Sequence, residues 1–153
     1  MAGQDAGDGR DGSPPEEHGW EPMDRPGPFT HYVGPFFMRN EGLGEGEPTR
    51  LGFRVQQHHC NPRLVCHGGM LATFVDLCLA RGLIAAEGIV GSAPTITMTM
   101  DFLAGAAMGD WIESRISVVK ITRQLGFVET ILHGSQGPVL RGSGTYKRPR
   151  PPA

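Results

Sequence analysis

The sequence predicts an α+β domain in which a curved antiparallel sheet wraps around one long central helix. Residues from about 68 to about 86 are apolar on nearly all sides, and such a helix needs cover over most of its surface. Four later segments alternate apolar and polar residues, which is typical of half-buried strands. Short turns separate these strands, and short turns join antiparallel neighbours. One apolar helix against one sheet is a stable layered arrangement of these elements.

The length and charge indicate one domain with unstructured ends. A chain of 153 residues is long enough for one proper core. Residues 1–28 are rich in Gly and Pro and carry a net charge of −5, so we expect most of them to be disordered, with Trp20 able to dock on the domain. Residues 29–148 then form the domain, and residues 149–153 form a frayed, Pro-rich tail.

Composition also narrows the function classes. The chain beyond residue 28 carries 12 bases and 9 acids, which suits an anionic ligand but is too weak a bias to indicate nucleic acid. The three cysteines form no Cys-x-x-Cys pair and are typical of reduced thiols. There is no secretory signal pattern, and Asp76 and Arg81 interrupt the longest apolar run. We therefore expect a cytoplasmic protein with no membrane-spanning segment.

Before the helix the pattern is irregular. Residues 29–39 contain enough apolar and aromatic side chains for a short element and a first strand. Residues 40–49 form a turn-rich loop. Residues 51–57 alternate and predict a half-buried strand, and residues 58–66 connect it to the helix, which the pair Glu87–Gly88 ends.

After the helix the sequence predicts four strands, at residues 95–102, 111–122, 127–133 and 139–147, joined by turns. In the first of these, strict alternation puts Ile96, Met98, Met100 and Phe102 on one face and Thr95, Thr97, Thr99 and Asp101 on the other.

Asp76 is the first candidate functional residue because it lies within the apolar run. The positions three and four residues away on either side carry no base, so an ion pair within the helix does not explain it. Burial of a carboxyl raises its pKa, which is the direction that suits a general base. The alternative is a carboxylate that reaches solvent or hydrogen-bonds the helix to a neighbouring element.

The turn His67-Gly68-Gly69 opens the helix and is the second candidate. Its backbone N–H groups and the helix dipole suit a carbonyl oxygen that gains negative charge. The alternative is a plain entry turn, since Gly pairs are common there. Asn61 could orient water or the His67 loop, or be an Asn-Pro turn residue. Thr95 could hold a water, or be an ordinary strand residue.

Other chemistries receive little support. His58, His59, Cys60, Cys66 and His67 are metal-ligand types, but adjacent strand residues point to opposite faces and the spacing does not match a zinc site. No metal and no organic cofactor is expected. A Cys66–His67 nucleophile is disfavoured because sequence neighbours rarely reach hydrogen-bond geometry. The chain has no P-loop, no Gly-x-Gly-x-x-Gly and no Gly-x-Ser-x-Gly.

The pattern Asn61, His67-Gly68-Gly69, Asp76 and Thr95 resembles the hotdog-fold acyl-CoA thioesterases of the phenylacetate-pathway (PaaI-like) type. The resemblance covers about residues 35–148. It implies a hotdog domain over residues 29–148, with a five- or six-stranded antiparallel sheet around the helix. It also implies a homodimer, often a dimer of dimers, with active sites shared between subunits.

The resemblance also implies residue roles. Asp76 matches the base or nucleophile, and Gly68 matches the backbone N–H that polarises the thioester carbonyl. Asn61 and Thr95 match residues that orient substrate or water, and Asp76 and Thr95 face Asn61 and Gly68 of the partner chain. His67 and Gly69 of the same turn are further candidates, His67 for catalysis and Gly69 for substrate binding. Basic groups hold the CoA phosphates in the family, for which this chain offers Arg63, Lys120, Arg123 and Lys147. One departure is Leu64, where the family often has Gly.

These residues favour hydrolysis of an acyl-CoA thioester, in which Gly68 N–H polarises the carbonyl and Asp76 activates water or attacks directly. Two alternatives stay open. A hotdog dehydratase or hydratase needs a catalytic His, for which His67 is available. A non-catalytic acyl-CoA-binding protein needs no base at Asp76. The expected ligand is an acyl-CoA, with no nucleic acid and no membrane as partner.

Overall fold

The predicted arrangement of one long helix on an antiparallel sheet is confirmed. The computed structural model describes residues 12–16, 19–40 and 48–151. Its elements are β1 (Glu21–Pro22), α1 (Pro28–Val33), β2 (Phe37–Arg39), β3 (Arg50–Arg54), the 3-10 helix η1 (Gln57–His59), α2 (Gly68–Glu87), β4 (Thr95–Phe102), β5 (Trp111–Ile121), β6 (Leu125–Gly134) and β7 (Gly137–Lys147). The strands form one sheet in the order β1-β2-β3-β5-β6-β7-β4, with every pair antiparallel.

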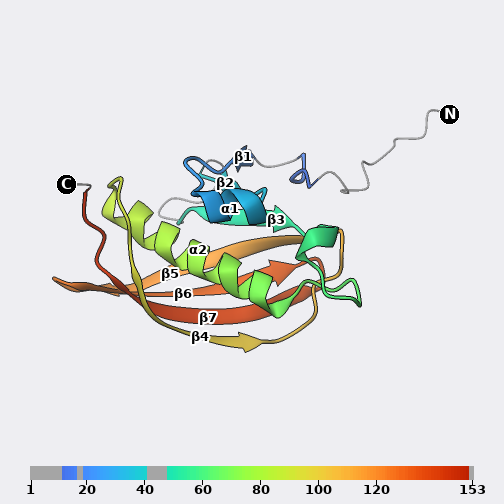
Figure 1. Ribbon diagram of the computed structural model, residues 1–153. Helices are drawn as coiled ribbons and strands as arrows, with labels where there is room; N and C mark the ends of the chain where they lie inside the picture. The colour runs from blue at the N-terminus through green and yellow to red at the C-terminus, as the bar shows by residue number, and fades with distance from the viewer. Residues whose placement is uncertain (1–11, 17–18, 41–47, 152–153) are drawn as a thin grey trace.

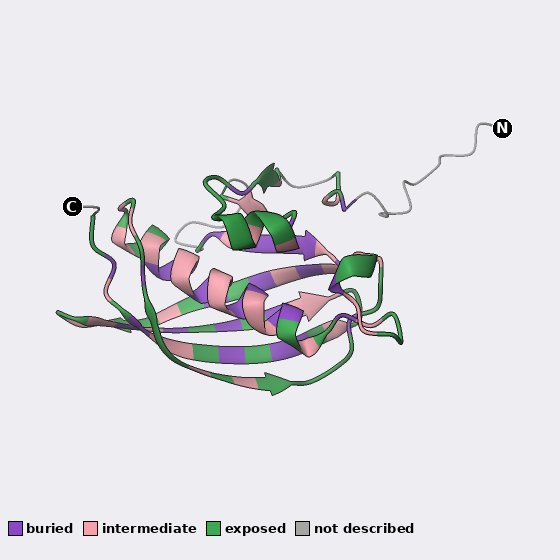
Figure 2. Ribbon diagram, in the orientation of Figure 1, coloured by how far each residue is buried: buried purple, intermediate pink, exposed green. Residues whose placement is uncertain are grey.

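The long helix α2 begins and ends where the sequence indicates. The His67 side chain accepts a hydrogen bond from Gly69 N and caps the first turn. Gly88 ends the helix in the left-handed conformation, with φ 63°. Figure 1 shows α2 lying across the inner face of the curved sheet. By length and apolar composition α2 would also suit a membrane span, but here its buried side packs on the sheet (Figure 2).

Glycines on the inner face of the sheet let α2 pack closely against the strands. A Cβ at Gly126 of β6 would lie 2.4 Å from Leu83, and a Cβ at Gly142 of β7 would lie 2.7 Å from Val75. Both helix residues are fully buried. Side chains at the two glycine positions would push the helix away, so the Gly residues set the spacing between the two layers.

The N-terminal segment differs from its expected disorder where it is described. Residues 19–27, here called the N-terminal strap, lie along the sheet edge: β1 pairs with β2, and Met23 is buried. Trp20 docks on Trp111 with ring centroids 5.0 Å apart, as its aromatic character allowed. The sheet therefore has seven strands rather than five or six. Residues 1–11 and 17–18 lie outside the described residues.

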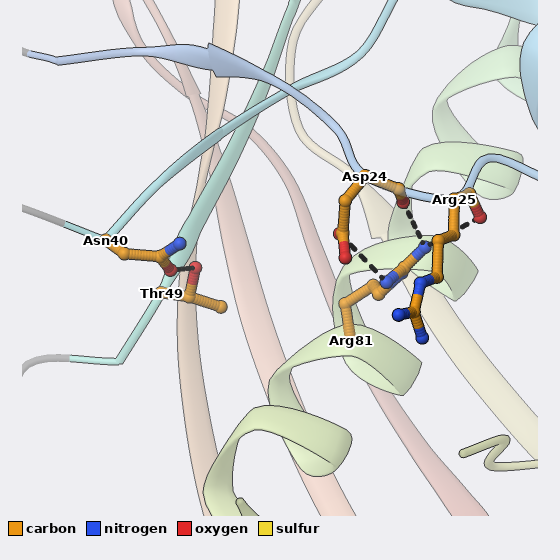
Figure 3. Close-up of polar contacts among 5 residues, drawn as sticks. All are labelled: Asp24, Arg25, Asn40, Thr49 and Arg81. Atoms are coloured by element: carbon orange, nitrogen blue, oxygen red, sulfur yellow. Dashed lines mark hydrogen bonds and ion pairs between the residues drawn. The ribbon is translucent and has the colours of Figure 1, made fainter. Parts of the chain in front are cut away.

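The N-terminal strap is also held by α2. The guanidinium of Arg81 donates to the backbone oxygens of Asp24 and Arg25, at 3.0 and 3.3 Å, and its Nη1 lies 3.4 Å from the Asp24 carboxylate (Figure 3). The same view shows Thr49 donating to the side chain of Asn40. That bond joins the two sides of the expected 40–49 loop, most of which, residues 41–47, lies outside the described residues.

Three strand boundaries differ from the prediction by two residues or more, for local reasons. The strand expected at residues 51–57 ends at Arg54, because Gln56 and His59 form a reciprocal capping box that starts η1. β6 and β7 begin earlier than expected, at Leu125 and Gly137, because the hairpins that join the last three strands are tighter than the turn residues suggested.

Candidate active site

Asp76 lies half-buried where α2 passes over the edge of the sheet formed by β4 and β7. Its Oδ1 accepts a hydrogen bond from Thr95 Oγ1 at 2.7 Å and another from Tyr146 Oη at 2.9 Å. Among the described residues, none donates to Oδ2. The Asp76 carboxylate thus links the helix to two strands. This is the structural role that the sequence left open as an alternative. Its second oxygen, Oδ2, stays available for chemistry.

Thr95 reaches Asp76 because of an irregularity in β4. Thr95 pairs with Tyr146 and Thr97 pairs with Thr145, so the intervening Ile96 is an extra residue in the strand. The predicted alternation is therefore wrong at this end. Thr95 faces α2, on the same side of the strand as Met98 and Met100, which pack against the core. It does not share the outer face with Thr97 and Thr99, as the alternation predicted. A one-residue bulge shifts which face a side chain occupies.

Tyr146 was not identified from the sequence. It is fully buried on β7. Burial raises the pKa of the Tyr146 phenol, and the neighbouring Asp76 carboxylate raises it further. The phenol therefore keeps its proton at physiological pH and acts as a donor. The sequence did contain a sign of this role. One face of the last strand carries Leu140, Gly142, Gly144 and Tyr146. Two glycines without side chains thus precede a large side chain with a polar end, on the face that meets the helix.

At the start of α2, Gly68 is the residue with an available N–H. Met70 N and Leu71 N donate to the carbonyl of His67, and Gly69 N donates to His67 Nδ1 at 2.8 Å. No described residue accepts from Gly68 N. The Gly69 N–H, predicted to contact substrate, is thus committed to the His67 cap, whereas Gly68 N–H is free to polarise a carbonyl.

The structure does not bring Gly68 and Asp76 together within one chain. They are eight residues apart on the same helix, which corresponds to about 12 Å along its axis. At that separation, Gly68 N–H cannot hydrogen-bond a thioester carbonyl while Asp76 of the same chain activates water for attack on the same carbonyl. A site that uses both residues on one bond needs the two groups from different copies of the chain.

Asn61 organises its own loop. Its Oδ1 accepts from Arg63 N at 2.9 Å and from Val65 N at 3.3 Å, as in an Asx turn. Leu64 in this loop has φ 57°, the left-handed conformation that glycine favours, at a cost of about 1 kcal/mol for a side chain with a Cβ. The loop thus keeps a glycine-type conformation although Leu replaces the Gly common in the family.

The histidines before the helix are structural. His58 and His59 lie in η1, not in a strand, and their rings are adjacent, with centroids 3.9 Å apart. Their Nε2 atoms bond to the carbonyls of Gly34 and Val33, at 3.0 and 2.7 Å. His59 Nδ1 accepts from Gln56 N. In the described ranges no group of three or more His, Cys, Asp or Glu side chains could hold a metal.

The cysteines are free thiols and are poor nucleophiles. Burial raises the pKa of Cys66 to about 12, with a smaller effect of Cys60, and burial also raises the pKa of Cys60. A thiol with such a pKa carries almost no thiolate at neutral pH.

The predicted basic residues separate into two groups. Arg63 is exposed in the loop before α2. Lys120, Arg123 and Lys147 lie at the other end of the sheet, where β5, β6 and β7 meet: Lys120 pairs with Phe127, and Lys147 pairs with Leu125. Of these, Lys147 lines a cleft of about 360 Å³; the other lining residues are Ser92, Pro94, Ile96, Gln124, Leu125, Arg148 and Arg150.

The sequence also matches known proteins. A family model described as the thioesterase superfamily matches residues 65–140, which hold the start of α2, Asp76 and Thr95. A Pseudomonas aeruginosa protein that carries the provisional name of esterase is 28% identical over 131 residues, covering 86% of this chain and 96% of that protein. The family-model match indicates a protein of the thioesterase class.

Solved structures agree on the fold. Zebrafish thioesterase superfamily member 2 superposes with a TM-score of 0.68 at 23% identity, over 82% of this chain and 88% of that one. A mutant of the phenylacetic acid degradation protein PaaI of Thermus thermophilus superposes with a TM-score of 0.65 at 22% identity, over 80% of this chain and 99% of that one. The chain is therefore similar in sequence to the thioesterase superfamily over about half of its length, and its structure has the hotdog fold.

His59 should make stability depend on pH. Burial lowers the pKa of His59 below its ordinary value of 6.5, outweighing the hydrogen bond to Val33. Below about pH 6.5 the unfolded chain binds a proton that the folded chain resists, so His59 contributes stability at higher pH that is lost as pH falls. We expect the free energy of unfolding to fall by up to about 1.4 kcal/mol per pH unit from this group. Urea unfolding from pH 7.5 to 5 measures it.

The matched control for this measurement is the neighbouring His58. His59→Asn should flatten the slope of stability against pH, whereas His58→Asn should retain most of it, because burial and not His58 is the main cause of the lowered pKa of His59. Equal slopes in the wild type and His59→Asn would contradict the assignment.

Proposed function

We propose that this protein hydrolyses acyl-CoA thioesters, with Asp76 as general base or nucleophile and Gly68 N–H as the group that polarises the thioester carbonyl. The observation that carries the proposal is the Asp76 carboxylate, half-buried on α2 of a chain similar to the thioesterase superfamily and held through one oxygen by two hydroxyls. The other oxygen is available to deprotonate water or to attack the carbonyl carbon.

We infer that the complete site combines two copies of the chain. The roughly 12 Å between Gly68 and Asp76 along α2 favours such a site. The strand β4 supplies a surface for pairing: it ends the sheet, most of its eight residues are exposed, and Ile96 and Phe102 expose about half of their side chains. A long strand with one unpaired edge of this kind favours pairing with another strand. The proposed assembly is a homodimer. The family resemblance also implies that two such dimers can associate as a dimer of dimers.

Support for CoA as the carrier of the acyl group comes from the cleft beside Thr95. Pro94 and Ile96, which flank Thr95, line the cleft together with Lys147 and Arg150. Arg148 also lines it but pairs with Glu87 at 2.9 Å, so its charge is partly neutralised. Phosphate groups of CoA in this cleft would leave the pantetheine arm free to extend toward Asp76.

The first prediction from this mechanism concerns Asp76. Asp76→Asn keeps the size of the side chain and removes its basicity, so kcat for a good acyl-CoA should fall at least about 100-fold, with KM nearly unchanged. The measurement is release of free thiol from a panel of short, long and aromatic acyl-CoAs. Glu129→Gln, at an exposed position on β6, is the control. Full turnover by Asp76→Asn would reject the proposal, and CoA-ester binding without turnover in the wild type would favour a binding protein.

The second prediction concerns Gly68, where proline removes the N–H without breaking the helix. Gly68 is the first residue of α2, a position that proline favours, and His67 has φ −61° and ψ 137°, as a residue before proline prefers. Gly68→Pro should lower kcat about 100- to 1,000-fold, as expected for loss of an oxyanion donor. Gly68→Ala keeps the N–H and should retain most activity, because its Cβ would meet Phe102 at an ordinary 3.4 Å. Similar kcat values for the two variants would argue against this donor.

The third prediction tests the CoA phosphates. The double variant Lys147→Ala/Arg150→Ala should raise KM for an acyl-CoA about 10-fold, since it removes two cations that face the cleft. KM for the same acyl group on pantetheine, which lacks the nucleotide phosphates, should stay unchanged. Lys120→Ala, whose side chain is exposed outside this cleft, is the control. An equal rise of KM for both thioesters would place the phosphates elsewhere.

A further inference from the structure

Packing alone does not explain the buried hydroxyl of Tyr146. The residue has no solvent exposure, and a phenylalanine would fill nearly the same volume. A hydroxyl at this depth costs free energy unless it forms a hydrogen bond. It lies 2.9 Å from Oδ1 of Asp76 and 3.5 Å from the backbone carbonyl oxygen of the same residue. The polar atom of Tyr146 is therefore directed at the candidate base.

The position of the ring is set by the sheet. A Cβ at Gly144, two residues earlier on the same strand, would lie 2.7 Å from Cε2 of Tyr146, so the missing side chain makes room for the ring. The backbone of Tyr146 is paired on both sides, with Thr95 of β4 and with Gly126 of β6. The core thus fixes the hydroxyl before any substrate binds, and Asp76 receives a donor that does not need to be organised during the reaction.

The two donors to Asp76 differ in their surroundings. Thr95 is exposed on an edge strand, so its hydroxyl can turn from the carboxylate toward an incoming molecule. Tyr146 is enclosed and has no such freedom. Of the two hydrogen bonds to Oδ1, the one from Tyr146 is the one that persists when substrate or water arrives.

We propose that Tyr146 is the positioning residue of the site: its hydroxyl holds Oδ1 of Asp76, which makes Oδ2 the oxygen that meets the reacting group and leaves Thr95 to hold water. This inference rests on the proposed function, because it takes Asp76 as the reacting carboxylate. Tyr146 acts through Asp76 and does not itself touch the substrate.

The test is Tyr146→Phe, which removes one oxygen and keeps the ring. We expect kcat to fall about 10- to 100-fold, the size expected for one hydrogen bond to a charged group, with KM within about twofold of the wild type. A residue that only filled space would leave kcat unchanged after this substitution. Tyr32→Phe is the matched control, because Tyr32 is the other tyrosine of the chain and its side chain is exposed. An unchanged kcat, or a loss that lies entirely in KM, would overturn the inference.

Asp76→Asn, assayed in parallel, separates this inference from the proposed function. If Asp76→Asn is inactive while Tyr146→Phe turns over like the wild type, the inference fails and the function stands. If Asp76→Asn keeps full turnover, both fail. In the Asp76→Asn background, Tyr146→Phe should cause no further loss, because residues that act as a unit are not additive. A second loss of the same size would contradict a role through Asp76.

A second measurement leaves Tyr146 in place and holds even if Tyr146→Phe fails to fold. In the Tyr32→Phe background, biosynthetic 3-fluorotyrosine labels Tyr146 alone. Its ¹⁹F resonance should move when Asp76 is changed to Asn, since the carboxylate that faces the phenol loses its charge. Glu129→Gln should leave the resonance in place. A resonance that is insensitive to Asp76→Asn would overturn the inference.

Discussion

The close approach of α2 to the sheet is the constraint on which the site depends. Gly142 and Gly144 leave two positions of β7 without side chains, and Val75 and Leu79 of the helix occupy that space. Asp76 follows Val75 directly, so the same contact brings its carboxylate within hydrogen-bond distance of Tyr146 and Thr95. A helix one side chain further from the strands would bury the same apolar residues less closely and would leave Asp76 without its two donors.

The resulting carboxylate has two different oxygens. Oδ1 is engaged by hydroxyls from two strands, and Oδ2 accepts nothing from the described residues. This asymmetry reconciles two interpretations of an acid in an apolar helix, because the structural hydrogen bonds and the proposed chemistry use different oxygens. At the helix start the division is similar. Gly69 N–H serves the His67 cap, and Gly68 N–H has no described acceptor.

Local signals predicted much of this from the sequence. The helix is uniformly apolar and begins and ends at glycines, so its bounds and the importance of Asp76 were readable. The features that sequence reasoning missed depend on distant contacts. Tyr146 meets Asp76 across 70 residues of chain. The face of Thr95 depends on a bulge that strict alternation cannot contain. The N-terminal strap is polar and Pro-rich overall, and it docks through contacts with distant parts of the chain: Trp20 and Met23 pack on the folded domain, and Arg81 of α2 binds Asp24 and Arg25.

The N-terminal strap makes the two edges of the sheet unequal. At one edge, β1 covers β2 with two residues, one of which is Pro22, and a proline has no N–H to offer a further strand. At the other edge, β4 presents eight residues. Among the described residues, only the β4 edge therefore offers a long row of backbone groups for strand addition. In the proposed pairing of two copies through β4, growth through sheet edges would stop at the pair, because β1 leaves the opposite edge short and contains Pro22. The N-terminal strap would then limit edge-to-edge pairing to closed pairs and oppose extension of the sheet into fibres.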